Sequence, residues 1–146
     1  MLMDKQTLFS EEQAITASAA SANYIDLGVA RNIGVGEDLY LVLTVTEEFD
    51  DTGDDSTITP VLQTDDNSAF SSAVAVRTYD TLAANSPVGT KKIYRLDPVN
   101  DAGTYEQYLR LYYTVAGGDL SAGKITAGLV CGVEAIKDYP TNFNVT

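Results

Sequence analysis

The chain has 146 residues and a mass of 15.6 kDa, which is enough for one domain but not for two full hydrophobic cores. It has 21 acidic and 9 basic residues, a net charge of -12, so we expect no broad binding of nucleic acid or of anionic membranes. It contains no histidine, the commonest general base and metal ligand. We therefore expect no enzyme, with no catalytic residues, no metal and no cofactor.

The first 22 residues fit two structures. Ser10-Glu11-Glu12-Gln13 resembles a helix capping box, and an alanine-rich run follows it. A helix there would bury only a thin apolar face, and Ala14-Ile15-Thr16-Ala17 fits an extended strand as well. Residues 10–22 can therefore be helix or strand on this pattern alone.

Alternation with a period of two residues dominates the rest of the chain. Leu39, Leu41, Leu43 and Val45 share one face of a predicted strand, and similar runs recur along the sequence. We predict strands at 23–28, 39–46, 56–64, 72–79, 91–96, 108–115 and 124–133, with Pro60 marking an edge or a bulge. The predicted core contains Leu39, Leu41, Leu43, Val45, Leu109, Leu111, Val115, Ile125 and Leu129. Cys131, the single cysteine, is interpreted as a buried small hydrophobe.

Turn-forming residues separate these runs. They occur at 50–55, 65–68, 100–103 and 117–119, where Asp, Asn and Gly favour tight backbone turns. Short strands divided in this way are typical of an all-β protein, and we predict an antiparallel two-sheet sandwich of about eight strands. The acidic turn Asp50–Asp55 could bind calcium through its carboxylates, but we expect a solvated hairpin tip.

One strand carries unusual residues on its outward face. Tyr108, Arg110 and Tyr112 alternate with the predicted core residues Leu109 and Leu111. Tyrosine and arginine are favoured in protein interfaces because they combine large contact area with a polar group. We predict an interface site at these three residues, although loops of the same chain could cover this face instead.

The order of several segments resembles the capsid cement proteins of certain tailed bacteriophages, the type first described in a Bordetella phage. The segments that carry the resemblance are 24–28 (YIDLG), 31–40 (RNIGVGEDLY), 62–65 (LQTD), 108–113 (YLRLYY) and 122–128 (AGKITAG). The resemblance covers about residues 8–140 and implies a jelly-roll sandwich on the outer surface of an icosahedral capsid. It also implies an extended N-terminal stretch, which favours a strand at 13–18. We assign 1–12 to an N-terminal arm and 13–146 to a single sandwich domain.

The function implied by this resemblance is structural. A cement protein made in the host cytoplasm would bind the major capsid protein, bridge its subunits and stabilise the shell, acting as a dimer or trimer. It has no catalytic or metal residues to transfer to this chain. The alternative is a carbohydrate- or receptor-binding sandwich from a fibre or spike, against which the absence of tryptophan counts.

Overall fold

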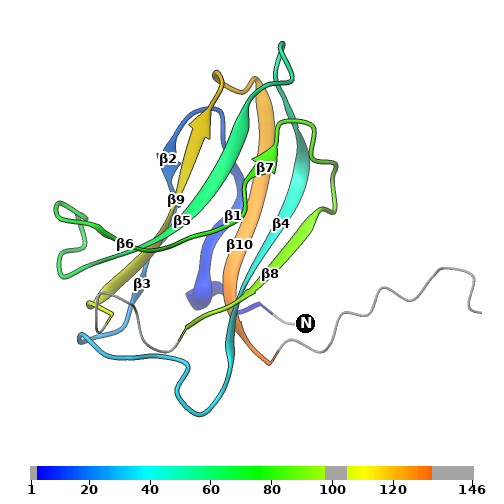
Figure 1. Ribbon diagram of the computed structural model, residues 1–146. Coiled ribbons are helices and arrows are strands. Elements are labelled where there is room, and N and C mark those ends of the chain that lie inside the picture. Colours follow the sequence, from blue (N-terminus) through cyan, green and yellow to red (C-terminus); the bar gives the residue numbers. More distant parts are fainter. Residues whose placement is uncertain (1–2, 98–104, 133–146) are drawn as a thin grey trace, which may run out of the picture.

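The computed structural model describes residues 3–97 and 105–132, which form two antiparallel β-sheets packed face to face (Figure 1). The strands are β1 (Leu8–Ala14), β2 (Ala19–Ala20), β3 (Ile25–Asp26), β4 (Leu39–Asp50), β5 (Thr57–Asp65), β6 (Val74–Thr78), β7 (Leu82–Ala83), β8 (Lys91–Arg95), β9 (Tyr108–Ala116) and β10 (Ala122–Cys131). A single 3-10 turn, η1 (Lys5–Thr7), precedes β1, and the described residues contain no α-helix. Accordingly, no helix in this part of the chain could cross a membrane.

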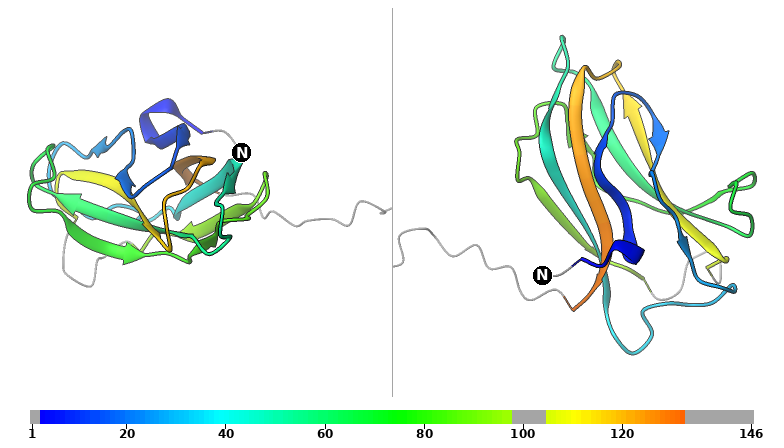
Figure 2. Two further views of the ribbon diagram at one scale, coloured as in Figure 1. Left: turned by 90° about the horizontal axis from the view of Figure 1, so that it is seen from above. Right: turned by 180° about the vertical axis from the view of Figure 1, so that it is seen from behind.

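The strand order is that of a jelly roll. One sheet has the order β1-β10-β4-β8, and the other has β2-β9-β5-β6 with β3 also on β9 and β7 also on β5. Because β2 and β3 share one side of β9, and β6 and β7 share one side of β5, the ten strands occupy eight positions. The predicted all-β sandwich of about eight strands is therefore confirmed. Figure 2 shows the two layers from above and, from behind, β1 beside β10.

The N-terminal region is extended, but its strand begins earlier than predicted. β1 starts at Leu8 and ends at Ala14, so the predicted bounds of 13–18 are wrong, and part of the predicted arm at 1–12 lies inside a sheet. The reason is that Phe9 and Ile15 are both fully buried, and they fix this segment to the core at its two ends. After Ile15 the chain crosses to β2 in the opposite sheet.

The inward faces of both sheets form one apolar cluster. The predicted core residues that are buried in it are Leu41, Leu43, Val45, Leu109, Leu111, Ile125 and Leu129. Leu39 and Val115 are only partly buried and pack against its margin, because each lies near an end of its strand. Aromatic side chains complete the cluster: Tyr113, which the alternation places on the same face as Leu109 and Leu111, and Phe9, Phe49, Tyr79 and Tyr105, which periodicity did not single out.

Pro60 lies neither at a sheet edge nor in a bulge. β5 pairs with β9 along its whole length, and on its other side it pairs first with β7 and then with β6. Pro60 falls between these two partners, where its carbonyl accepts a hydrogen bond from the Tyr79 N–H at 2.9 Å. Since neither short strand pairs with Pro60, the missing N–H breaks no ladder there, and a proline is tolerated inside the sheet.

Gly123 makes the irregular pairing of β10 possible. The register between β10 and β4 shifts between Ala122 and Lys124, across this residue, and again between Lys124 and Ile125; the φ of Gly123 is +132°. A Cβ atom at this position would collide with the ring of Phe49, which is buried in the core. The glycine therefore allows the strand to bend closely over an aromatic core residue.

Truncation of a central core residue tests this packing. We expect Leu111→Ala to lower the free energy of unfolding by about 2–5 kcal/mol, because Leu111 is fully buried and the change leaves a cavity. Urea denaturation followed by circular dichroism measures the loss. The exposed Thr114→Ser, in the same strand, should change it by less than about 0.5 kcal/mol. Equal effects of the two variants would contradict the assigned core.

Candidate functional site

The three predicted interface residues lie together on the outer face of one sheet. Tyr108, Arg110 and Tyr112 alternate along β9, and each side chain is half-buried. Their partners on the adjacent strand β5 are Asp65, Gln63 and Val61. The alternation that places Leu109 and Leu111 in the core therefore also places these three residues on the opposite face.

Arg110 is held by contacts within the chain. Its Nε donates a hydrogen bond to Gln63 Oε1 at 2.8 Å. The guanidinium lies 4.3 Å from the centre of the Phe70 ring and 5.7 Å from that of Tyr112, which are cation–π distances. Burial lowers the pKa of Arg110 from its usual high value. Arg110 is thus a fixed and partly desolvated cation, not a freely extended side chain.

Phe70 comes from the loop between β5 and β6, which projects from the side of the sandwich in Figure 1. Its side chain is buried, and its φ of 51° lies in the left-handed region that non-glycine residues rarely adopt. The Phe70 N–H donates to the Asn67 carbonyl at 2.9 Å, which closes the turn. The alternative in which the chain's own loops cover this face is therefore true in part, since this loop covers Arg110 with an aromatic ring.

Tyr24 extends the same cluster from the other side. Its ring packs edge-to-face against Tyr108 at 5.5 Å and against Phe70 at 6.1 Å, yet 49% of the residue remains exposed. We call Tyr24, Phe70, Tyr108, Arg110 and Tyr112 the aromatic patch. Sequence periodicity found three of these residues because they share a strand. It did not assign Tyr24 and Phe70 to the patch, because they reach it from other segments of the chain.

Asp65 holds the loop that carries Phe70. This buried carboxylate accepts hydrogen bonds from the backbone N–H groups of Asn67 and Ser72 at 2.9 and 2.8 Å, and from the Ser72 hydroxyl at 3.2 Å. Burial acts to raise the pKa of Asp65, but the hydrogen bonds from Asn67 and Ser72 outweigh it and hold the pKa below its usual value. The ionised carboxylate is therefore the form that stabilises the loop.

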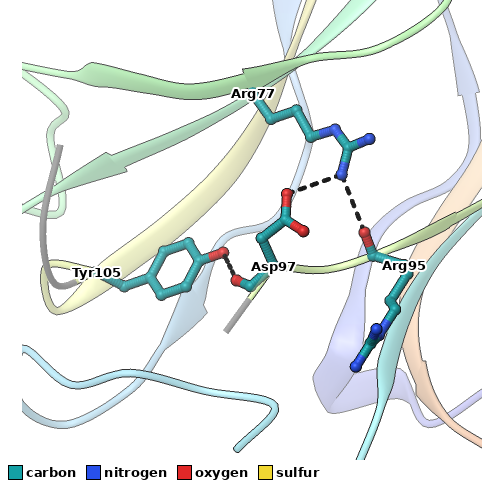
Figure 3. Close-up of polar contacts among 4 residues, drawn as sticks. All are labelled: Arg77, Arg95, Asp97 and Tyr105. Atoms are coloured by element: carbon teal, nitrogen blue, oxygen red, sulfur yellow. Dashed lines mark hydrogen bonds and ion pairs between the residues drawn. The ribbon is translucent and has the colours of Figure 1, made fainter. Parts of the chain in front are cut away.

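A polar cluster connects the two sheets at the side of the sandwich where β6 and β8 are the edge strands. Arg77 of β6 donates through Nη1 to Asp97 Oδ2 at 2.9 Å and to the Arg95 carbonyl at 3.2 Å (Figure 3). The Tyr105 hydroxyl donates to the Asp97 carbonyl at 2.5 Å, and burial raises the pKa of Tyr105 to about 12. These contacts join the edge strand of one sheet to the end of β8 in the other, so we assign them a structural role.

A cavity of about 420 Å³ opens where β3, β4 and β10 come together. Its lining is mainly apolar and consists of Asp4, Thr7, Ile25, Leu27, Ile33, Leu39, Leu129, Val130 and Cys131. Cys131 is exposed, so its predicted burial is wrong. It shares the inward face of Leu129 but is the last residue of β10, where it lines this cavity instead of the core.

In the acidic turn between β4 and β5, a carboxylate accepts a hydrogen bond from the backbone of the turn itself. Asp51 Oδ2 accepts a hydrogen bond from the Ser56 N–H at 3.1 Å, and hydrogen bonding from Ser56 lowers the pKa of Asp51. Asp54 and Asp55 are exposed. Within residues 3–97 and 105–132, no group of three or more His, Cys, Asp or Glu side chains is arranged to hold a metal ion.

The protein is thus a jelly-roll β-sandwich that carries the aromatic patch on the outer face of one sheet. The sequence matches the Bbp16 family over residues 9–129, and the chain belongs to that family. The family name points to a protein of a Bordetella phage, which is consistent with a structural role in a virion. None of the curated proteins matches the chain.

The pH dependence of the Phe70 loop follows from Asp65. Because folding lowers the pKa of this carboxyl, its contribution to stability is present above the unfolded pKa of about 4 and is lost as the pH falls through the folded value. Asp65→Asn should lower the melting temperature at pH 7. It should also make the melting temperature fall less steeply as the pH drops below about 4. The exposed Asp119→Asn serves as the control. Identical melting curves against pH for both variants would contradict this role.

Proposed function

We propose that this protein is a capsid cement protein, which binds the outer surface of an icosahedral phage capsid and bridges major capsid protein subunits. The observation that carries the proposal is the match to the Bbp16 family over residues 9–129, which spans the sandwich from β1 to β10. The jelly-roll fold agrees with what the resemblance to phage cement proteins implies. The function requires no catalytic chemistry, only a rigid domain and contact surfaces.

The aromatic patch supports the proposal as a contact surface. Tyrosine and arginine dominate the energetics of many protein interfaces, and here they are fixed before any partner arrives. Arg110 is stacked and hydrogen-bonded, and Tyr24 and Tyr108 pack against each other, so little side-chain entropy remains to be lost on binding. The half-exposed ring of Tyr24 supplies the apolar area that a partner would cover.

The overall charge is compatible with assembly on a shell. A net charge of -12 keeps the free protein soluble and repels packaged or free nucleic acid. Affinity then depends on local patches repeated at many equivalent sites of the lattice. A homo-oligomer, as a dimer or a trimer, would engage several subunits at once and gain avidity without a strong single contact.

Capsid binding tests the proposal directly. The protein should sediment with expanded, undecorated capsids of the phage that encodes it, and the decorated capsids should resist heating better than bare ones, because bound cement adds contacts between subunits. Sedimentation and thermal release of DNA measure the two effects. Binding to a glycan array without any binding to capsids would instead favour the carbohydrate-binding alternative, in which the exposed Tyr24 ring would stack on a sugar.

The patch itself can be tested with a paired substitution. Tyr108→Ser combined with Tyr112→Ser should weaken capsid binding about tenfold or more, or convert the oligomer to monomers, depending on which partner the patch contacts. The control is Tyr40→Ser, a half-buried tyrosine of β4 that lies in the other sheet. A folded double variant that keeps both its oligomeric state and its capsid affinity would leave the patch without a role.

A further inference from the structure

The sheet edges of this sandwich differ in how they are protected. β1 and β6 are edge strands whose pairing with their neighbours contains register shifts, and β2 and β3 have two residues each. β8 is different: it pairs with β4 alone, in continuous register from Arg95 opposite Tyr40 to Lys91 opposite Thr44. Bulges and short strands hinder the addition of another strand. Among the described edge strands, β8 is the one of five residues whose pairing has no register shift, so it is best suited to accept another strand.

The backbone of β8 has hydrogen-bonding groups on its outer side that no residue in 3–97 or 105–132 pairs as a further strand. The Val45 N–H donates to the Thr90 carbonyl, and the Leu96 N–H donates to the Leu39 carbonyl, so the even-numbered residues face β4. The N–H and carbonyl groups of Lys91 and Ile93 therefore face away from the sheet. In Figure 3, Arg77 reaches the carbonyl of Arg95, the next outward-facing residue, and so marks one end of the open edge.

This edge is positively charged on an acidic protein. β8 has the sequence KKIYR, so three of the chain's 9 basic residues lie in one five-residue strand. The basic side chains paired with carboxylates are Arg77 with Asp97, Arg95 with Asp38, and Lys124 with Glu47. Lys91 and Lys92 form no ion pair with any residue that the structure describes. Their charges are available to an outside partner.

We infer that the β8 edge accepts an extended acidic segment of the capsid subunit as an additional strand of this sheet, an inference that rests on the proposed function. The backbone groups of Lys91 and Ile93 would supply the ladder hydrogen bonds, and Lys91 and Lys92 would select for acidic side chains on the incoming strand. A second β8, paired antiparallel about Ile93, would set Lys91 against Arg95, two cations, and is disfavoured. The β1 edge of another copy is already occupied in part, since the Phe9 carbonyl accepts a hydrogen bond from the Asn23 N–H of the same chain.

Charge reversal tests the selectivity of this edge. Lys91→Glu combined with Lys92→Glu should weaken binding to undecorated capsids about tenfold or more, because like charges would then face each other. Binding of the unaltered protein should weaken as salt concentration rises. The matched control is Lys5→Glu with Arg31→Glu, which makes the same change in net charge at exposed residues elsewhere. An equal loss in both double variants would assign the effect to total charge and overturn the inference.

A backbone variant separates strand addition from simple attraction. Ile93→Pro removes an outward-facing N–H without breaking the pairing to β4, whereas Ile93→Val keeps it. With folding checked by circular dichroism, the proline variant should bind capsids about tenfold more weakly and the valine variant normally. Loss of the oligomer instead would mean that a second copy occupies β8, and equal capsid binding by both variants would overturn strand addition. If the unaltered protein does not bind capsids, the proposed function fails and this inference with it.

Discussion

The packing of two inward-facing apolar surfaces against each other is the constraint on which the rest of this structure depends. β4 and β10 supply one surface and β5 and β9 the other, and the residues between them are almost completely excluded from water. Because successive strand residues point to opposite faces, burying one set fixes the direction of every other side chain. The outward positions of Tyr108, Arg110 and Tyr112 are a consequence of burying Leu109 and Leu111.

The aromatic patch shows how a surface feature can be made rigid without entering the core. Phe70 is brought over β9 by a loop that depends on the buried carboxylate of Asp65, and Arg110 lies between Phe70 and Tyr112. A charged group that is stacked and hydrogen-bonded in the free protein loses little freedom when a partner covers it. Such preorganisation suits a protein whose proposed role is to attach to many identical sites on a shell.

The two sides of the sandwich are closed in different ways. On one side the chain crosses from β1 to β2 after Ile15, which links the two sheets covalently. On the other side the sheets end in β6 and β8; the chain crosses there too, from β7 to β8, and Arg77, Asp97 and Tyr105 add polar contacts between the sheets. This second side therefore combines two edge strands with the basic residues of β8 and with Arg77. The asymmetry gives the molecule two distinct surfaces, which is what bridging between subunits would require.

The sequence by itself determined the all-β class, most strand positions and most of the core, because alternating side chains are a local signal read along one strand. It also placed Tyr108, Arg110 and Tyr112 on one outward face for the same reason. Only the tertiary structure decided that β1 begins at Leu8, that Pro60 lies between two short partner strands, and that Cys131 is exposed. It alone brought Phe70 over Arg110 and Tyr24 against Tyr108, and it left the β8 edge without a further strand among the described residues. These features depend on contacts between segments distant in sequence, which no local pattern encodes.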